Sequence, residues 1–262
     1  MRWTITILIL LAFQWYSFQG LKTVTANKWI WFVYILVIFL VIGNLLVHTL
    51  YLERSPTTEP RLMYAIGFFL AIFVFQTIIS LVLLTEDIFR VPQAIYNYLT
   101  KIPGEIKFIP TRRSFVSKIA LALAAIPFTS LLYGMYKGKY NFKVLKYELE
   151  YDDLPEAFDG FTITQISDLH SGSFDNVEKV NYGIDLVNKQ QSDLILFTGD
   201  LVNNTSKEVL PWIPHFKKFN APNGVYSVLG NHDYGDYMRW DSPDEKLKNI
   251  KDLYQAQKDM GW

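Results

Sequence analysis

The chain has 262 residues, of which 50% are hydrophobic and 16% aromatic, and its formal net charge is zero. This composition excludes an ordinary soluble domain as a full description, because so apolar a chain places part of itself in lipid. The balanced charge gives no electrostatic reason to expect nucleic acid as a partner. The absence of cysteine excludes disulfides and thiolate metal sites.

Long apolar stretches in the first half of the chain predict membrane helices. Four stretches free of Asp, Glu, Lys and Arg are present: residues 3–18, 29–52, 62–84 and 119–136. The second and third are long enough to cross a bilayer, whereas the first is shorter and the fourth contains Pro127. A cleaved signal peptide is the alternative for the first, although only Arg2 precedes it and no Ala-x-Ala site follows. We therefore predict a transmembrane region of about four helices over residues 1–136.

The pattern changes in residues 137–262, where short apolar runs alternate with amphipathic segments. This order is typical of a domain that alternates strands and helices. Three runs predict buried strands, over residues 161–167, 193–198 and 225–229. Between the first two, apolar residues recur at helical spacing and predict a helix over residues 176–189. A strand, a helix and a second strand in this order predict a right-handed βαβ unit with parallel strands.

A last helix is predicted after the third strand. Ser242 is a typical N-cap, and Pro243 and Glu245 follow at positions favoured in the first helical turn. The helix is expected to run to about Met260, because Gly261 suits a C-terminal cap.

Each predicted strand ends in a polar cluster, and the three clusters carry the functional signal. Their sequences are ISDLHSG, FTGDLVNN and VLGNHDYG, at residues 166–172, 197–204 and 228–235. Because the carboxyl ends of parallel strands meet at one edge of a sheet, these clusters are expected to converge. Asp168 and His170 can hold one ion together, and the two carboxylate oxygens of Asp200 can bridge two ions. Asn231 can offer a neutral amide oxygen to the second ion.

Three motifs, in this order at the strand ends, resemble those of the calcineurin-like metallophosphoesterases: Asp168-x-His170, Gly199-Asp200 and Gly230-Asn231-His232-Asp233. The resemblance implies an α/β domain in which a β-sandwich is flanked by helices. It also implies two divalent ions, of Mn, Zn, Fe or Mg, and a metal-bound hydroxide that attacks a phosphoester.

The resemblance also implies a role for each of the matching residues. Asp168 and His170 would bind the first ion, Asp200 would bridge, and Asn231 would bind the second ion. His232 would act as a general acid or stabilise the transition state. Asp233 would orient His232.

The family completes its site with histidines further along the chain, and none follows His232 here. The sequence has four histidines: His48, His170, His215 and His232. His48 is interpreted as a residue of a membrane helix, and His215 as a partly buried helix residue rather than a ligand. We expect the phosphoesterase domain to be incomplete at its C-terminus, so that the full-length protein is an enzyme and these 262 residues are weakly active or inactive. The alternative is a membrane-bound interaction module without catalysis.

A basic stretch before the fourth apolar segment bears on orientation. TRRSFVSKIALALAAIPF, residues 111–128, resembles an internal twin-arginine export signal, and the alternative is a positive-inside flank. Either interpretation holds Arg112, Arg113 and Lys118 in the cytoplasm and places the phosphoesterase domain outside a bacterial inner membrane. Four lysines on the other side of that segment nearly balance this charge: Lys137, Lys139, Lys143 and Lys146. An anchor holds the site near the bilayer surface, which favours a lipid-linked or nucleotide-like phosphoester as the substrate.

Overall fold

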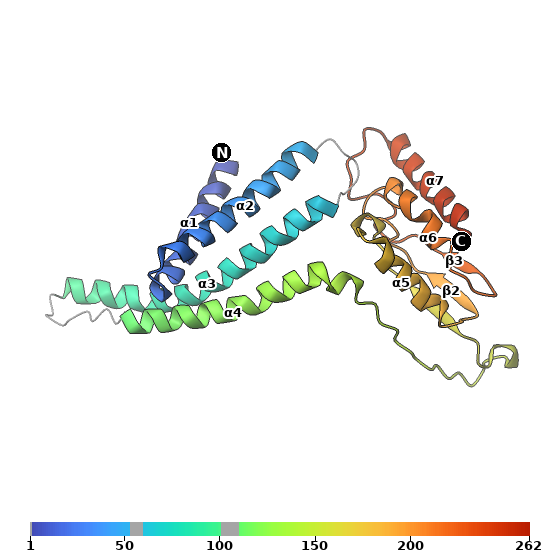
Figure 1. The fold of residues 1–262 in the computed structure, drawn as a ribbon, viewed down its shortest axis with the longest axis horizontal. Coiled ribbons are helices and arrows are strands. Elements are labelled where there is room, and N and C mark those ends of the chain that lie inside the picture. The colour runs from blue at the N-terminus through green and yellow to red at the C-terminus, as the bar shows by residue number, and fades with distance from the viewer. Residues whose placement is uncertain (1, 53–59, 101–109) are drawn as a thin grey trace. The chain divides into compact units, whose positions relative to one another are not determined.

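The computed structural model describes residues 2–52, 60–100 and 110–262 and is shown in Figure 1. The chain forms two compact units: among the described residues, the first comprises residues 2–48, 64–100 and 110–138, and the second comprises residues 139–262 together with residues 49–52 and 60–63 at the ends of two helices. The first unit is helical, whereas the second contains the strands.

Four helices make up the helical unit: α1 (Arg2–Val24), α2 (Lys28–Leu52), α3 (Pro60–Leu99) and α4 (Pro110–Tyr136). Three segments in the described residues are long and apolar enough to cross a membrane: Lys28–Thr49, Pro60–Pro92 and Arg112–Tyr136. The described part of α1 is not among them, so the span expected at residues 3–18 stays a prediction. Helices α3 and α4 begin before the expected stretches, at Pro60 and Pro110, and proline favours helix initiation at a first position; α3 also continues past Leu84 to Leu99.

The interior of the helical unit is polar as well as apolar. Ile79 and Leu83 of α3 pack against Ala120 and Ala124 of α4 in a buried cluster. In addition, Gln14 of α1 and Gln76 of α3 exchange two side-chain hydrogen bonds, of 2.8 and 2.7 Å. Paired amides of this kind hold neighbouring helices together in an apolar environment.

The two neighbouring arginines of α4 have different surroundings. Arg112 is exposed, whereas Arg113 is only 6% exposed. The Arg113 guanidinium donates to Glu86 at 2.7 Å and to both oxygens of Asp87 at 3.1 and 3.3 Å. Asp87 also accepts a hydrogen bond of 2.7 Å from the hydroxyl of Tyr16. This buried ion cluster joins α1, α3 and α4. Of the two arginines that resembled one basic signal, Arg113 belongs to the cluster and Arg112 faces outward.

The second unit is built on one parallel sheet. Its strands are β1 (Ile163–Ile166), β2 (Leu194–Phe197) and β3 (Val225–Ser227), in the order β1-β2-β3. The register pairs Ile163 with Leu194 and Ile195 with Val225. The three predicted strands and the parallel βαβ unit are therefore confirmed, with somewhat shorter strands. Among the described residues these strands form a single sheet, so the β-sandwich that the resemblance implied is not seen there.

Helices α5 (Val177–Asn188), α6 (Ile213–Phe216) and α7 (Pro243–Met260) accompany the sheet. The Asn176 side chain caps α5 by accepting from the Lys179 amide, and Ser242 caps α7 by accepting from the Glu245 amide. Gly261 adopts the left-handed conformation expected of a helix C-cap, with φ 87°. The expected helices at residues 176–189 and 242–260 are thus confirmed.

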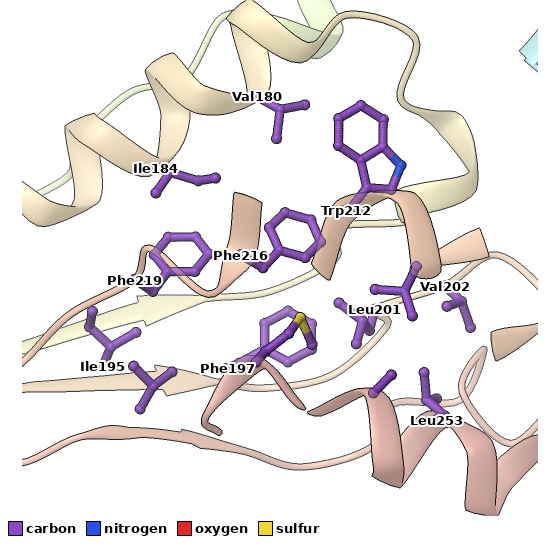
Figure 2. Close-up of a cluster of buried hydrophobic side chains, with 14 of the residues drawn as sticks. Val180, Ile184, Ile195, Phe197, Leu201, Val202, Trp212, Phe216, Phe219 and Leu253 are labelled. Carbon is purple, nitrogen blue, oxygen red and sulfur yellow. The ribbon is translucent and has the colours of Figure 1, made fainter. Parts of the chain in front are cut away.

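One apolar core holds the sheet and helices together (Figure 2). Ile195 and Phe197, alternate residues of β2, belong to this core and are almost fully buried. Figure 2 shows Val180 and Ile184 of α5 facing the aromatic ring of Phe216. The loops at the carboxyl ends of the strands are therefore carried by a rigid support.

Candidate metal centre

Loops that follow β1 and β2 stay paired beyond the ends of the strands. The backbone N–H of Asp168 donates to Gly199 O, and that of His170 donates to Asp200 O, both at 3.0 Å. This continued pairing brings the first two motifs side by side at the carboxyl edge of the sheet, where ligands bind in open α/β folds.

Three of the predicted ligands have an uncommon backbone conformation. Asp168, His170 and Asp200 all lie in the left-handed region, with φ of 56°, 45° and 61°. Non-glycine residues adopt this region rarely, although Asp and His do so more readily than most. Such conformations cost about 1 kcal/mol or more each and cluster at functional sites, because the surrounding fold must hold them in place.

The second and third motifs touch through glycines. A Cβ atom on Gly199 would lie 2.6 Å from the Cα of Gly230, and a Cβ on Gly230 would collide with the Asp200 carboxylate. Gly199 also has φ 109°, a value that favours glycine. The close approach of the ends of β2 and β3 therefore requires glycine at both positions.

His170, Asp200 and His232 offer ligand atoms that all lie within 4.8 Å of one another. His170 Nε2 is 3.8 Å from Asp200 Oδ2, and the rings of His170 and His232 are 4.7 Å apart, edge to face. Asp168 Oδ1 lies 3.8 Å from the same His170 nitrogen, but its side chain is 65% exposed and it is not in the group of three. The three-residue group thus includes His232, which we expected to be catalytic rather than a ligand.

Imidazole and carboxylate donors in this arrangement suit Mn, Zn or Fe. Asp200 is buried, and an isolated buried carboxylate is costly unless cations or hydrogen-bond donors face it. Its Oδ1 accepts one hydrogen bond, from the backbone N–H of His232 at 2.9 Å. The residues present therefore fit a divalent ion.

His232 is oriented by a backbone group. Its Nδ1 lies 2.7 Å from the carbonyl oxygen of Asn203, an atom that can only accept a hydrogen bond. Nδ1 therefore carries the hydrogen, and Nε2 is left to accept a proton or to bind an ion. Sequence reasoning missed Asn203, because a backbone carbonyl leaves no signal in the residue type.

The carboxylate of Asp233, which we expected to orient His232, makes its hydrogen bonds to backbone groups. Asp233 is fully buried, and its carboxylate accepts from four backbone N–H groups at 2.8 to 3.2 Å: those of Asp200, Leu201, Val202 and Gly230. Burial raises the pKa of the Asp233 carboxyl above its usual value, and the four N–H donors oppose that rise. Asp233 thus fastens the loop after β2 to the loop after β3.

Asn231 is exposed and donates from its Nδ2 to the hydroxyl oxygen of Tyr237 at 2.8 Å. The Tyr237 ring also lies against His232, with ring centroids 4.5 Å apart. Nothing in the sequence pattern singled out Tyr237, because it stands in an irregular loop without periodicity.

The remaining histidines lie elsewhere. His215 is on α6, and its Nδ1 is 2.9 Å from the Asn181 amide oxygen of α5, so the contact is between helices. His48 lies on α2 in the helical unit. Both positions agree with the interpretation of these histidines as structural residues.

Comparison with known proteins covers both units of the chain. A family model described as "Probable Calcineurin-like phosphoesterase, transmembrane domain" matches residues 1–139, and one described as "Calcineurin-like phosphoesterase" matches residues 161–260. No solved structure matches the chain significantly.

Three curated relatives illustrate the range of similar proteins. The uncharacterized metallophosphoesterase YkuE of Bacillus subtilis is 34% identical, over 48% of this chain and 46% of its own length. The transmembrane protein with metallophosphoesterase domain of Danio rerio is 25% identical, over 47% of this chain and 27% of its own length. The UDP-2,3-diacylglucosamine pyrophosphatase LpxG of Chlamydia trachomatis is 36% identical, over 34% of this chain and 28% of its own length. The chain thus spans less than half the length of these relatives.

Proposed function

Because the chain belongs to the calcineurin-like phosphoesterases that carry an N-terminal transmembrane domain, we propose that it is a membrane-anchored, metal-dependent phosphoester hydrolase. The observation that carries this proposal is the convergence of His170, Asp200 and His232 from three different loops. Hydrophobic packing does not explain why one buried carboxylate and two imidazoles meet at the carboxyl edge of a sheet. A divalent ion held by His170 and Asp200, with His232 beside it as a proton donor, does explain it.

We assign each residue around this group a separate role in binding the ions. Asp200 would be the shared ligand of two ions, because its Oδ1 accepts a single hydrogen bond among the described residues and lone pairs remain on both oxygens. His170 and the exposed Asp168 would hold one ion, and the amide oxygen of Asn231 would hold the other. Divalent ions bound here would polarise the phosphoryl oxygens and activate a water molecule.

His232 acts on the leaving oxygen. The carbonyl of Asn203 holds Nδ1–H, which leaves Nε2 as the nitrogen that gains and loses a proton. In its protonated form the ring can donate from Nε2 to the oxygen that leaves phosphorus, or stabilise the negative charge that develops there.

The substrate that we propose is a lipid-linked or nucleotide-like phosphoester at the surface of a bacterial inner membrane. Two observations support it. The helical unit contains three segments able to cross a membrane, which would keep the site close to the bilayer. The name of the chlamydial relative describes a pyrophosphatase whose substrate has both a nucleotide and a diacylated sugar.

The experiment that tests the proposal compares Asp200→Asn with the unchanged chain in detergent micelles. We expect Mn²⁺ to bind the unchanged chain, and Asp200→Asn to weaken binding at least tenfold, because it removes a negative charge from the shared ligand. Hydrolysis of a chromogenic nitrophenyl phosphodiester by the full-length protein should fall in parallel.

Asp185→Asn is the matched control, because Asp185 is an exposed carboxylate on α5. It should bind Mn²⁺ as the unchanged chain does. Equal Mn²⁺ affinity in Asp200→Asn and Asp185→Asn would refute a metal site at these residues.

A further inference from the structure

The loop that follows His232 is folded back on itself and fastened to α7. Gly235 has φ 68°, and its carbonyl accepts from the indole of Trp240 at 2.7 Å. Asp236 pairs with Lys246 on α7. Tyr237 lies within both of the segments that these contacts close, residues 235–240 and 236–246, and is therefore restrained beside the third motif.

Tyr237 contacts two residues of the proposed site and lies outside the apolar core. Its hydroxyl oxygen accepts from Asn231 Nδ2 at 2.8 Å, and its ring lies 4.5 Å from that of His232 at an interplanar angle of 33°. The residue is nevertheless 62% exposed. Burial of apolar area is thus a small part of what Tyr237 contributes, and its contacts are with the site.

The hydrogen bond to Tyr237 restrains the side chain of Asn231. An Asn side chain has one accepting oxygen and one donating nitrogen, and only the oxygen can bind a metal ion. In the structure the nitrogen faces the phenol oxygen, which leaves the amide oxygen as the end for an ion. Without this partner the Asn231 side chain has more rotational freedom, so the ligand is less preorganised.

The imidazole of His232 is held on two sides. Its Nδ1 donates to the Asn203 carbonyl, which restrains one edge of the ring. The Tyr237 ring packs against the His232 ring. Aromatic rings in contact at this separation favour one ring orientation over others.

We propose that Tyr237 is a positioning residue of the metal centre, which orients the Asn231 amide oxygen toward the second ion and fixes the plane of the His232 ring. This inference rests on the proposed function. Residues that orient metal ligands through hydrogen bonds typically change metal affinity by about 10- to 100-fold when they are replaced.

The test uses two substitutions that separate the two contacts. Tyr237→Phe removes the hydroxyl but keeps the ring, whereas Tyr237→Leu removes both. Tyr254→Phe is the control, because Tyr254 is an exposed tyrosine on α7. Mn²⁺ binding to the 262-residue chain in micelles is followed by the electron paramagnetic resonance signal of free Mn²⁺. The histidine ring protons are followed by NMR on histidine-labelled protein, in which four histidines give few signals.

We expect Tyr237→Phe and Tyr237→Leu each to weaken Mn²⁺ binding about tenfold, and Tyr254→Phe to leave it unchanged. Only Tyr237→Leu should move the His232 ring signals, because it alone removes the aromatic ring current. The melting temperatures of the tyrosine variants should match that of the unchanged chain, which separates positioning from a loss of folding.

Two negative results are distinguishable. If Asp200→Asn loses Mn²⁺ binding and Tyr237→Phe does not, the proposed function stands and the role of Tyr237 is refuted. If the unchanged chain and Asp200→Asn bind Mn²⁺ equally, the proposed metal site falls, and the role of Tyr237 falls with it.

Discussion

At the scale of single residues, the arrangement of the candidate metal centre depends on groups that do not themselves face an ion. Asp233 is the clearest case, since one carboxylate fastens four backbone amides of two loops. The backbone amide of Asp200 is one of the four, so Asp233 supports the candidate ligand Asp200 through the main chain. The motif that contains Asp233 therefore places a residue that holds the backbone next to His232, a candidate for the chemistry.

We expect Asp233→Asn to destabilise the fold. The amide nitrogen that replaces one carboxylate oxygen cannot accept, so two buried N–H groups lose their partner, at a cost of about 3 kcal/mol in the free energy of unfolding. Urea denaturation of the chain in micelles, followed by tryptophan fluorescence, measures the change. Asp185→Asn serves again as the exposed control, and equal stability of the two variants would contradict the role given to Asp233.

At the scale of elements, the buried ion cluster between the helices is the feature whose loss we expect to lower stability the most. Arg113 of α4 is paired with Glu86 and Asp87 of α3, and Tyr16 of α1 completes the cluster. Removing one member of a buried ion pair leaves an uncompensated charge, which typically costs 3–5 kcal/mol. The cluster therefore links three helices more firmly than their apolar contacts alone would.

Arg113→Gln is expected to lower the stability of the helical unit by about 3 kcal/mol, because the two carboxylates lose their cation. Arg112→Gln is the matched control, since Arg112 is exposed on the same helix. Denaturation in increasing amounts of a harsh detergent, followed by the loss of helical circular dichroism, compares the two variants. A similar midpoint for both would show that the cluster contributes little.

At the scale of the whole molecule, the charges that flank α4 bear on which side of the membrane the phosphoesterase domain lies. The exposed Arg112 and Lys118 precede the apolar part of α4 and favour the cytoplasm for that end of the helix. The charge of Arg113, by contrast, is balanced by its carboxylate partners. The basic flank is therefore weaker than the sequence alone indicates, although its sign is unchanged.

We expect alkaline phosphatase fused after residue 146 to be active in a bacterial host, because that reporter folds only outside the cytoplasm. A fusion after residue 100, on the other side of α4, should be inactive. The opposite pattern would place the phosphoesterase domain in the cytoplasm and refute the proposed topology.

Local sequence patterns were sufficient to predict the strands and helices of the second unit. Strands of β-branched and aromatic residues, the asparagine and serine caps of α5 and α7, and the parallel βαβ unit could all be predicted, because each depends on neighbours along the chain. Helix lengths were less predictable. α3 and α4 continue past their apolar stretches, because charged residues there are satisfied by partners on other helices.

The sequence by itself determined that polar clusters end three strands, and hence that Asp168, His170, Asp200, Asn231 and His232 are candidates for one site. Only the tertiary structure decided how these candidates are supported. It assigns Asp233 to the backbone rather than to His232, gives His232 the Asn203 carbonyl as a partner, and places Tyr237 on the site. The physical reason is that these contacts join loops distant in sequence through backbone atoms and ring faces, which residue type and spacing do not encode.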